Sequence, residues 1–303
     1  MSDIAENNIR CGFVALVGAP NAGKSTLLNQ LVGTKVSIVS PKVQTTRTRV
    51  LGICIAGQSQ IAFIDTPGIF APKRRLDRAM VAAAWGGASE ADDVVLLVDA
   101  SKGITRDTEE IITRLKDTQS KVILALNKVD QVKKPILLDL AAKLDAEGVF
   151  SDVFMISALK GNGVDDLLAF LAARAPEGPW HYPEDQISDL PDRMLAAEIT
   201  REKVFLQLKQ ELPYRITVET ENWEERKDGS VKIDQLLFVQ KDGHKQIVLG
   251  KGGQQIKRIG AAARRELEEI LDCKVHLFLF VKVRESWEDD PERYRHWGLD
   301  FNA

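Results

Sequence analysis

The segment Gly18-Ala-Pro-Asn-Ala-Gly-Lys-Ser25 constrains the fold of this chain most, because it follows a short apolar run and opens a helical pattern. A glycine-rich turn between a strand and a helix directs backbone N–H groups inward, and the helix N-terminus adds its positive dipole end. The pattern is that of a phosphate-binding loop, in which the lysine reaches the β- and γ-phosphates and the serine holds Mg²⁺. The expected ligand contacts are Gly18, Ala19, Pro20, Asn21, Ala22, Gly23, Lys24, Ser25 and Thr26.

Strand-like and helix-like segments alternate around this loop over the first half of the chain. This alternation predicts an α/β domain with a mostly parallel sheet and helices on both faces. The predicted strands are 13–17, 50–56, 60–65, 93–99, 121–126 and 152–156, and the predicted helices are 23–31, 76–89, 105–116, 134–147 and 164–174.

A second, smaller α+β domain is predicted after a connection rich in proline, which favours an extended backbone. Its pattern is a helix, two strands, a turn at Asp242-Gly243, a short apolar stretch, a glycine loop, a helix and a last strand. The expected bounds of these segments are 192–211, 214–220, 231–240, 246–249, 254–271 and 274–283. We therefore expect a nucleotide domain over 1–176, a linker over 177–191, and the second domain with its C-terminal tail over 192–303.

Bulk composition narrows the setting of these two domains. The 303 residues are 44% hydrophobic and 28% charged with a net charge of −3, so affinity for nucleic acid must come from a local patch. Cys11, Cys54 and Cys273 are scattered, which argues against a disulfide framework or a zinc site and favours a reducing cytosol. The polar N-terminus lacks the apolar stretch of a signal peptide, and no apolar run is long enough to span a bilayer.

The motif Asp65-Thr-Pro-Gly68 follows a predicted strand. After a phosphate-binding loop, such an aspartate can join the Mg²⁺ shell and such a glycine can offer its N–H to the γ-phosphate. Asp65, Thr66, Pro67, Gly68 and Ile69 are therefore expected beside the phosphates.

The base is expected at Asn127-Lys-Val-Asp130, which follows another predicted strand. A carboxylate at Asp130 can accept hydrogen bonds from the guanine N1–H and exocyclic amine, a pair of donors that adenine does not offer. Asn127 is expected to bond the purine N7, and the stem of Lys128 to cover the base face. In Ser157-Ala158, the Ala158 N–H is expected to donate to guanine O6.

These motifs resemble the guanine-nucleotide-binding domain of translation-factor-like GTPases, from about Gly12 to Arg174. The resemblance implies GTP and GDP as ligands, Mg²⁺, and a slow transfer of the γ-phosphoryl group to water. Ras-like enzymes orient that water with a glutamine just beyond the glycine of this motif, but here Ile69 and Phe70 are apolar. The residues expected to take part in hydrolysis are Lys24, Asn21, Thr45, Thr46 and Gly68.

Two open choices concern this hydrolysis. Asn21 resembles the loop asparagine of GTPases that bind K⁺, and such an ion would supply charge to the transition state; the alternative is that Asn21 only stabilises the loop. Thr45 or Thr46 is expected to join Ser25 and Asp65 around Mg²⁺, and chemistry alone does not choose between them. The first switch is expected over 36–49 and the second over 69–77, both ordered by the γ-phosphate.

The second glycine loop, Gly250-Lys-Gly-Gly253, resembles that of a KH domain of the second topology, where it grips single-stranded nucleic acid. Residues 241–265 carry seven basic side chains against Asp242 alone. The expected RNA contacts are Gly250, Lys251, Gly252, Gly253, Lys257 and Arg258, over an apolar floor of Ile247, Val248, Ile256 and Ile259 that serves mainly as core. The alternative is a small interaction domain without RNA.

A GTPase domain joined by a proline-rich linker to a KH domain is similar to the Era family of bacterial GTPases over nearly the whole chain. That resemblance implies a monomer that binds the 3′ end region of 16S ribosomal RNA and assists maturation of the small ribosomal subunit. It also implies a cytoplasmic protein with possible peripheral contact at the inner membrane. The alternatives are a GTPase acting on another RNA or in tRNA modification, and an RNA chaperone whose nucleotide is structural. We expect Trp287, Tyr294 and Trp297 to pack onto the KH domain, with stacking on RNA bases as the alternative.

Overall fold

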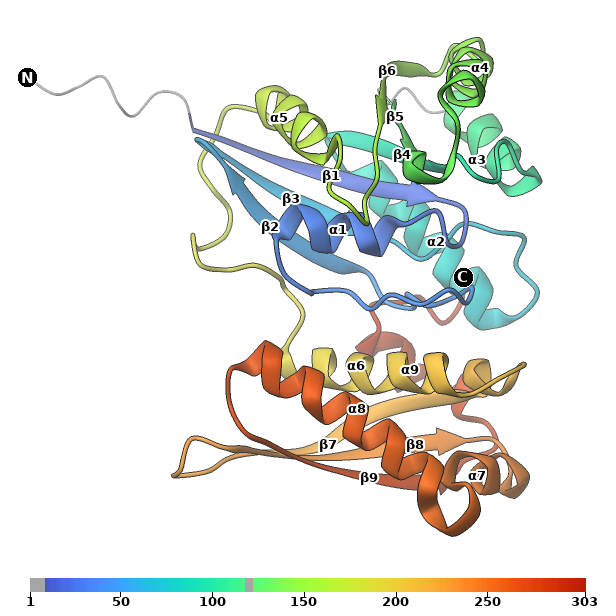
Figure 1. The fold of residues 1–303 in the computed structure, drawn as a ribbon, viewed down its shortest axis with the longest axis vertical. Helices are drawn as coiled ribbons and strands as arrows, with labels where there is room; N and C mark the ends of the chain where they lie inside the picture. Colours follow the sequence, from blue (N-terminus) through green and yellow to red (C-terminus); the bar gives the residue numbers. More distant parts are fainter. Residues whose placement is uncertain (1–8, 118–121) are drawn as a thin grey trace, which may run out of the picture. The chain divides into compact units, whose positions relative to one another are not determined.

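The computed structural model describes residues 9–117 and 122–303, and these form two compact units (Figure 1). Unit 1 contains the chain up to Ser37, Thr46–Asp189 and Tyr294–Ala303, whereas unit 2 contains Ile38–Thr45 and Leu190–Arg293. The first residue of one predicted strand, Lys121, and most of the N-terminal segment lie outside the described residues. Among the described residues, no helix is both long and apolar enough to cross a membrane.

Unit 1 is a six-stranded sheet in the order β2-β3-β1-β4-β5-β6, with only the β2–β3 pair antiparallel among the described strands. The predicted α/β class is therefore confirmed. The strands are β1 (Arg10–Gly18), β2 (Val50–Ala56), β3 (Ser59–Asp65), β4 (Asp93–Asp99), β5 (Val122–Asn127) and β6 (Phe150–Met155). The helices are α1 (Lys24–Val32), α2 (Arg75–Glu90), α3 (Arg106–Lys116), α4 (Lys134–Asp145) and α5 (Val164–Arg174).

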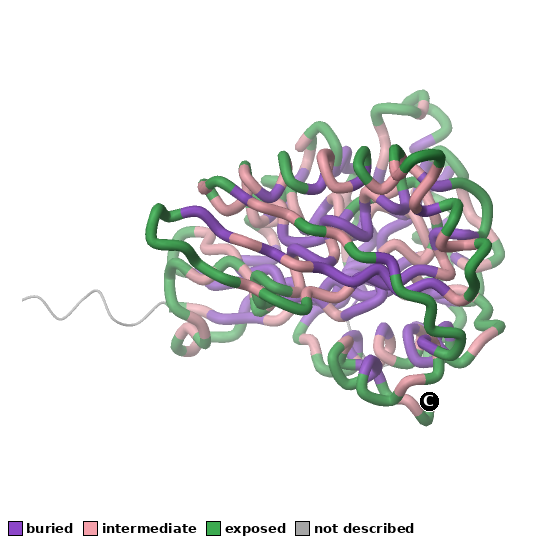
Figure 2. Tube along the Cα trace, turned by 90° about the horizontal axis from the view of Figure 1, so that it is seen from below, coloured by how far each residue is buried: buried purple, intermediate pink, exposed green. Residues whose placement is uncertain are grey.

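Both faces of this sheet are covered by helices, which explains its near-continuous apolar strands. In β4, Val95 and Leu97 belong to the core formed with α1 and α5, whereas Val94, Leu96 and Val98 belong to the core formed with α2, α3 and α4. Buried residues accordingly gather in the interior and exposed residues on the outer turns (Figure 2). The carboxyl ends of the parallel strands carry the motifs that the sequence singled out.

The linker is an extended segment that lies along β2 within unit 1. The N–H of Ile53 donates to the carbonyl of Ile187 at 2.9 Å, and the N–H of Leu51 donates to Asp189 Oδ1 at 3.0 Å. These bonds satisfy backbone groups that an edge strand would otherwise expose.

Unit 2 is a three-stranded sheet in the order β7-β8-β9 with two long helices, α6 and α8, and the short helix α7, which confirms the KH-like class. The β7–β8 pair is antiparallel and the β8–β9 pair is parallel. The strands are β7 (Ile216–Glu225), β8 (Val231–Val239) and β9 (Val275–Val283), and the helices are α6 (Asp192–Gln207), α7 (Asp242–Leu249) and α8 (Gln254–Leu271).

Two local predictions in the second half of the chain are wrong. The turn expected at Asp242-Gly243 is the first turn of α7, where Asp242 suits the positive end of the helix dipole. Of the aromatic residues near the end, Trp287 is buried in unit 2, but Tyr294 and Trp297 pack in unit 1 with Met80 of α2.

Candidate nucleotide site and nucleic-acid groove

The phosphate-binding loop joins β1 to α1 and encloses Lys24. Gly18 and Gly23 have φ angles of +154° and +104°, a backbone conformation that L residues with a side chain rarely adopt. A Cβ on Gly23 would lie 2.2 Å from the side-chain nitrogen of Asn127. Lys24 Nζ donates to the carbonyls of Gly18 and Ala19 at 3.0 and 3.2 Å. Burial lowers the pKa of Lys24 to about 8, so an anion beside it would favour its charged form.

Oxygen atoms suited to a hard cation lie next to this lysine. Ser25 Oγ and Ser37 Oγ donate to Asp65 Oδ2 at 2.6 and 2.9 Å, and Thr46 Oγ1 lies 2.9 Å from Ser25 Oγ. Asp65 Oδ1 is buried and has no hydrogen-bond partner. Burial raises the pKa of Asp65, although Ser25 and Lys24 act in the opposite direction. This set of oxygen atoms fits Mg²⁺, and the unpaired carboxylate oxygen would be one of the ligands of the ion.

The two candidate switch threonines have different surroundings. Thr45 Oγ1 donates to the carbonyl of Lys42 at 2.7 Å and lies 2.6 Å from Ser40 Oγ, within the segment assigned to unit 2. Thr46 belongs to unit 1 and is the threonine whose hydroxyl lies beside Ser25. The structure thus brings Thr46, and not Thr45, to the candidate metal ligands Ser25 and Asp65.

The residue after the Asp65–Gly68 motif is fixed by packing. Gly68 has no room for a side chain, since a Cβ would lie 2.9 Å from Pro20 Cα. The N–H of Ile69 donates to the carbonyl of Gly18 at 3.1 Å, and its side chain is buried in the core with α2, α3 and α4. An apolar, buried side chain at this place cannot orient the attacking water.

Asn127 ties the base-recognition segment to the phosphate-binding loop. Its Nδ2 donates to the carbonyl of Ala22 at 2.8 Å, while its Oδ1 accepts the N–H groups of Lys128 and Ala158 at 2.8 and 3.0 Å. The Ala158 N–H, expected to meet guanine O6, therefore bonds Asn127 here. Through these contacts, Asn127 holds the phosphate-binding loop and the segment of Ala158 together.

Asp130 carries the expected carboxylate at the base position. Ser157 Oγ donates to its Oδ1 at 2.7 Å, and this bond lowers the pKa of Asp130. An ionised carboxylate can accept from both guanine donors. Here Asp130 Oδ2 lies 3.8 Å from Lys160 Nζ, and Oδ1 accepts from Ser157.

Sequence reasoning missed Asp99, at the carboxyl end of β4. Lys128 Nζ donates to Asp99 Oδ2 at 2.6 Å and to the carbonyl of Asn21 at 2.8 Å. Although burial opposes the shift, hydrogen bonds from Lys128 and Ser101 lower the pKa of Asp99. An aspartate closing a buried apolar strand was the available signal, because the ends of neighbouring parallel strands meet at one edge.

The second glycine loop joins α7 to α8 and is open to solvent. Gly250, Gly252 and Gly253 have φ angles of +70°, +60° and +75°. A Cβ on Gly252 or Gly253 would meet nothing within 4 Å. Lys251, Lys257 and Arg258 are exposed on or after the loop. The backbone of an extended ligand could thus approach the loop closely.

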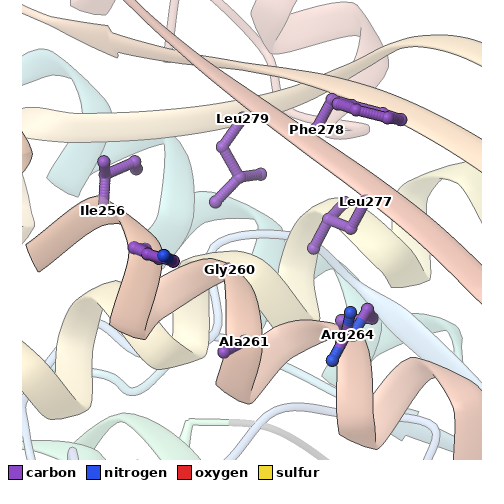
Figure 3. Close-up of a pocket in the computed structure, with 8 residues that line it drawn as sticks. Ile256, Gly260, Ala261, Arg264, Leu277, Phe278 and Leu279 are labelled. Carbon is purple, nitrogen blue, oxygen red and sulfur yellow. The ribbon is translucent and has the colours of Figure 1, made fainter. Parts of the chain in front are cut away.

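A groove of about 380 Å³ lies between α8 and β9 (Figure 3). Leu277 and Leu279 face the helix across it, and Lys257 and Arg264 add positive charge. Ile256 lines the groove, and Val248 and Ile259 are fully buried, as expected of residues that serve mainly as core, whereas Ile247 is 57% exposed. The full lining is Ile256, Lys257, Gly260, Ala261, Arg264, Leu277, Phe278 and Leu279.

The β9 side of this groove was not predicted. The alternation of side chains along the last strand could have assigned one face of β9 to α8, but sequence alone does not say which strand borders the groove.

Comparison with known proteins identifies both domains. A family model described as 50S ribosome-binding GTPase matches residues 13–128, and a KH domain model matches residues 211–288. GTPase Era of Sinorhizobium medicae is 63% identical over 292 residues, which cover 96% of this chain and 94% of that protein. GTPase Era of Brucella suis is 62% identical over the same shares. This chain belongs to the Era family of GTPases.

Solved structures of Era proteins share the fold over nearly the whole chain. Era in complex with MgGDPNP and nucleotides 1506–1542 of 16S ribosomal RNA has a TM-score of 0.91 at 41% identity, covering 96% of this chain and 99% of that one. An Aquifex aeolicus Era variant bound to GDP.AlF4⁻ has a TM-score of 0.90 at 41% identity, with the same coverage. The predicted activity is thereby confirmed: the protein hydrolyses GTP.

Proposed function

We propose that this protein is a GTP-dependent switch that binds the 3′ end region of 16S ribosomal RNA and assists maturation of the small ribosomal subunit. The observation that carries the proposal is the open glycine loop beside an apolar groove with basic rims, in a chain of the Era family. A related Era protein has been solved with that RNA region. The protein then acts as a monomer in the cytoplasm, and any contact with the inner membrane is peripheral.

In the hydrolysis site, Lys24 contacts the β- and γ-phosphates, and Ser25, Thr46 and Asp65 hold Mg²⁺. The ion, when bound, offsets negative charge on the phosphates. The Gly68 N–H donates to the γ-phosphate and thereby links it to the second switch. Of the two threonines we assign the metal to Thr46, because its hydroxyl lies 2.9 Å from Ser25 Oγ.

With no glutamine after Gly68, the charge that develops in the transition state needs another partner. We assign this role to K⁺ held by Asn21, whose φ angle of +64° places it in a left-handed turn of the phosphate-binding loop. GTP hydrolysis is expected to be faster in K⁺ than in Na⁺ at matched ionic strength, and Asn21→Ala should remove that difference. Equal rates of the unaltered protein in the two salts would contradict the assignment.

RNA recognition is tested by fluorescence anisotropy with a labelled oligonucleotide that copies the 3′ end region of 16S RNA. A scrambled oligonucleotide of the same composition is the control for charge alone, since phosphate contacts are blind to sequence. The full-length protein, with a GTP analogue bound, is expected to prefer the native sequence at every salt concentration tested. Equal affinity for both oligonucleotides would favour a GTPase acting on another RNA.

A further inference from the structure

The C-terminal tail, Tyr294–Ala303, belongs to unit 1 and packs against α2, whose first residues belong to the expected second switch. Tyr294 and Leu299 are buried with Leu76 and Met80, and Trp297, Phe301 and Ala303 border the cluster. The tail is folded on itself, since the N–H of Leu299 donates to the carbonyl of Tyr294 at 2.8 Å. The rings of Tyr294 and Phe301 meet edge to face at 5.0 Å.

The two halves of α2 are buried by different parts of the chain. In the second half, Ala84 and Ala88 pack in the core beneath the sheet. In the first half, Leu76, Ala79 and Met80 pack with the tail. Because a helix is stabilised mainly by burial of its apolar face, the first turns of α2 depend on the tail.

These first turns set the end of the second switch. Asp77 Oδ2 accepts the N–H groups of Lys73 and Arg74 at 3.1 and 3.0 Å, which fixes where the loop enters the helix. Arg75, the first residue of α2, places its guanidinium 4.4 Å from the centre of the Phe301 ring. The tail thus contacts α2 at its first residue, inside the segment 69–77 expected to form the second switch.

We infer that the C-terminal tail is a positioning element for the second switch, and that GTP hydrolysis depends on its packing against Leu76, Met80 and Arg75. The contacts that place the tail are with α2, through Leu76, Met80 and Arg75, so GDP affinity should not depend on them. Hydrolysis requires Gly68 and the loop after it to hold one geometry against the γ-phosphate, and small displacements of such groups cost rate steeply.

The test compares the double variant Leu299→Ala, Phe301→Ala with Asn302→Ala in the full-length protein. Asn302 is the exposed neighbour of Phe301 and serves as the matched control. Single-turnover GTP hydrolysis is expected to slow by about three- to tenfold in the double variant, since ring and cation–π contacts are lost. GDP affinity should change less than about twofold, as a site without tail contacts predicts. A hydrolysis rate that is unchanged or raised would overturn the proposal.

A second pair of variants separates positioning from loss of folding. Phe301→Leu keeps an apolar side chain but removes the ring from Arg75, and Arg75→Gln removes the cation. If the two groups act together, the protein that carries both Phe301→Leu and Arg75→Gln should hydrolyse GTP no more slowly than the slower of the two single variants. Additive losses would show that the Arg75–Phe301 contact does not carry the effect. Amide exchange in residues 69–80 should rise in Phe301→Leu, and unchanged exchange would also contradict the inference.

Discussion

The two glycine loops of this protein look alike in sequence but are built under opposite constraints. In the phosphate-binding loop, a side chain on Gly23 would collide with Asn127, and Gly68 is pressed against Pro20. In the second loop, a Cβ on Gly250 would lie 2.7 Å from Gln255 Cβ, but Gly252 and Gly253 face open space and need glycine only for their positive φ angles. An enclosed loop recognises a small ligand through many neighbours, whereas an open loop recognises the backbone of a long one. The predictions below test this difference, from the largest expected effect to the smallest.

Gly23→Ala should abolish tight nucleotide binding, because its Cβ would lie 2.2 Å from Asn127 Nδ2 in a backbone conformation that already disfavours alanine. We expect GDP affinity to fall by at least about a hundredfold, or roughly 3 kcal/mol. Fluorescence titration with a labelled GDP analogue measures the loss. Gly33→Ala is the matched control, since its φ is +79° but its Cβ would meet nothing within 4 Å. An equal loss in both variants would show that backbone strain, not enclosure, matters.

Asp130→Asn should exchange the base preference from guanine to xanthine. The variant loses one acceptor for the guanine donors and gains an amide donor that suits the second carbonyl of xanthine. GTP affinity is expected to fall by about thirtyfold, in line with the loss of a hydrogen-bonded pair to a charged group. Competition between GTP and XTP for the labelled nucleotide gives the ratio. Unchanged GTP affinity would remove Asp130 from the base site.

Gly252→Asp should weaken RNA binding by about tenfold through negative charge beside the phosphates, while leaving GDP affinity intact. The Cβ itself finds open space, so the fold of unit 2 should persist. Gly229→Asp has the same charge change and a similar φ of +78°, in the turn between β7 and β8. If the control weakens RNA binding equally, general repulsion explains the result and the loop loses its special role.

The enclosed loop should also respond to pH. Because burial lowers the pKa of Lys24 to about 8, the nucleotide-free protein loses this proton before a phosphate-bound lysine would. GDP binding must then take up a proton above that pH, so affinity should fall by about fourfold between pH 7 and pH 8.5. By the same linkage the folding stability of the free protein rises over pH 8 to 10. Calorimetry in buffers of different ionisation enthalpy detects the proton uptake. A flat pH profile would show that Lys24 keeps its charge without nucleotide.

Most element positions in both units follow from the sequence, because buried strands and amphipathic helices leave strong periodic patterns. The bounds of β4, α5 and α8 agree with the predicted ones. The first turn of α7 was missed, since Asp242-Gly243 also fits a tight turn and only tertiary packing of Val248 decides for the helix.

The nucleotide site was predictable in its residues because its motifs follow strands that share one sheet edge. The choice between Thr45 and Thr46 was not predictable, because adjacent threonines are chemically identical and only the path of the chain separates them. Asp99 and the β9 wall of the groove were missed for a related reason. Both act through neighbours that are distant in sequence, so the sequence can indicate their position on a strand but not the residues that they contact.

The packing of the tail on α2 also bears on how the protein is made. Arg78 and Ala303 are 225 residues apart, and their contact lies in the same region as the Leu76–Tyr294 cluster. During synthesis, the rest of unit 1 emerges long before the tail that covers the first turns of α2. A nascent chain would thus bind GTP early and acquire its full hydrolysis rate only when residues 294–303 have left the ribosomal exit tunnel. The test compares two ribosome-bound chains, one stalled after Ala303 and one after Arg293, each followed by the same linker, which is long enough to clear the exit tunnel. A difference in hydrolysis at equal GDP binding would reveal such a delay.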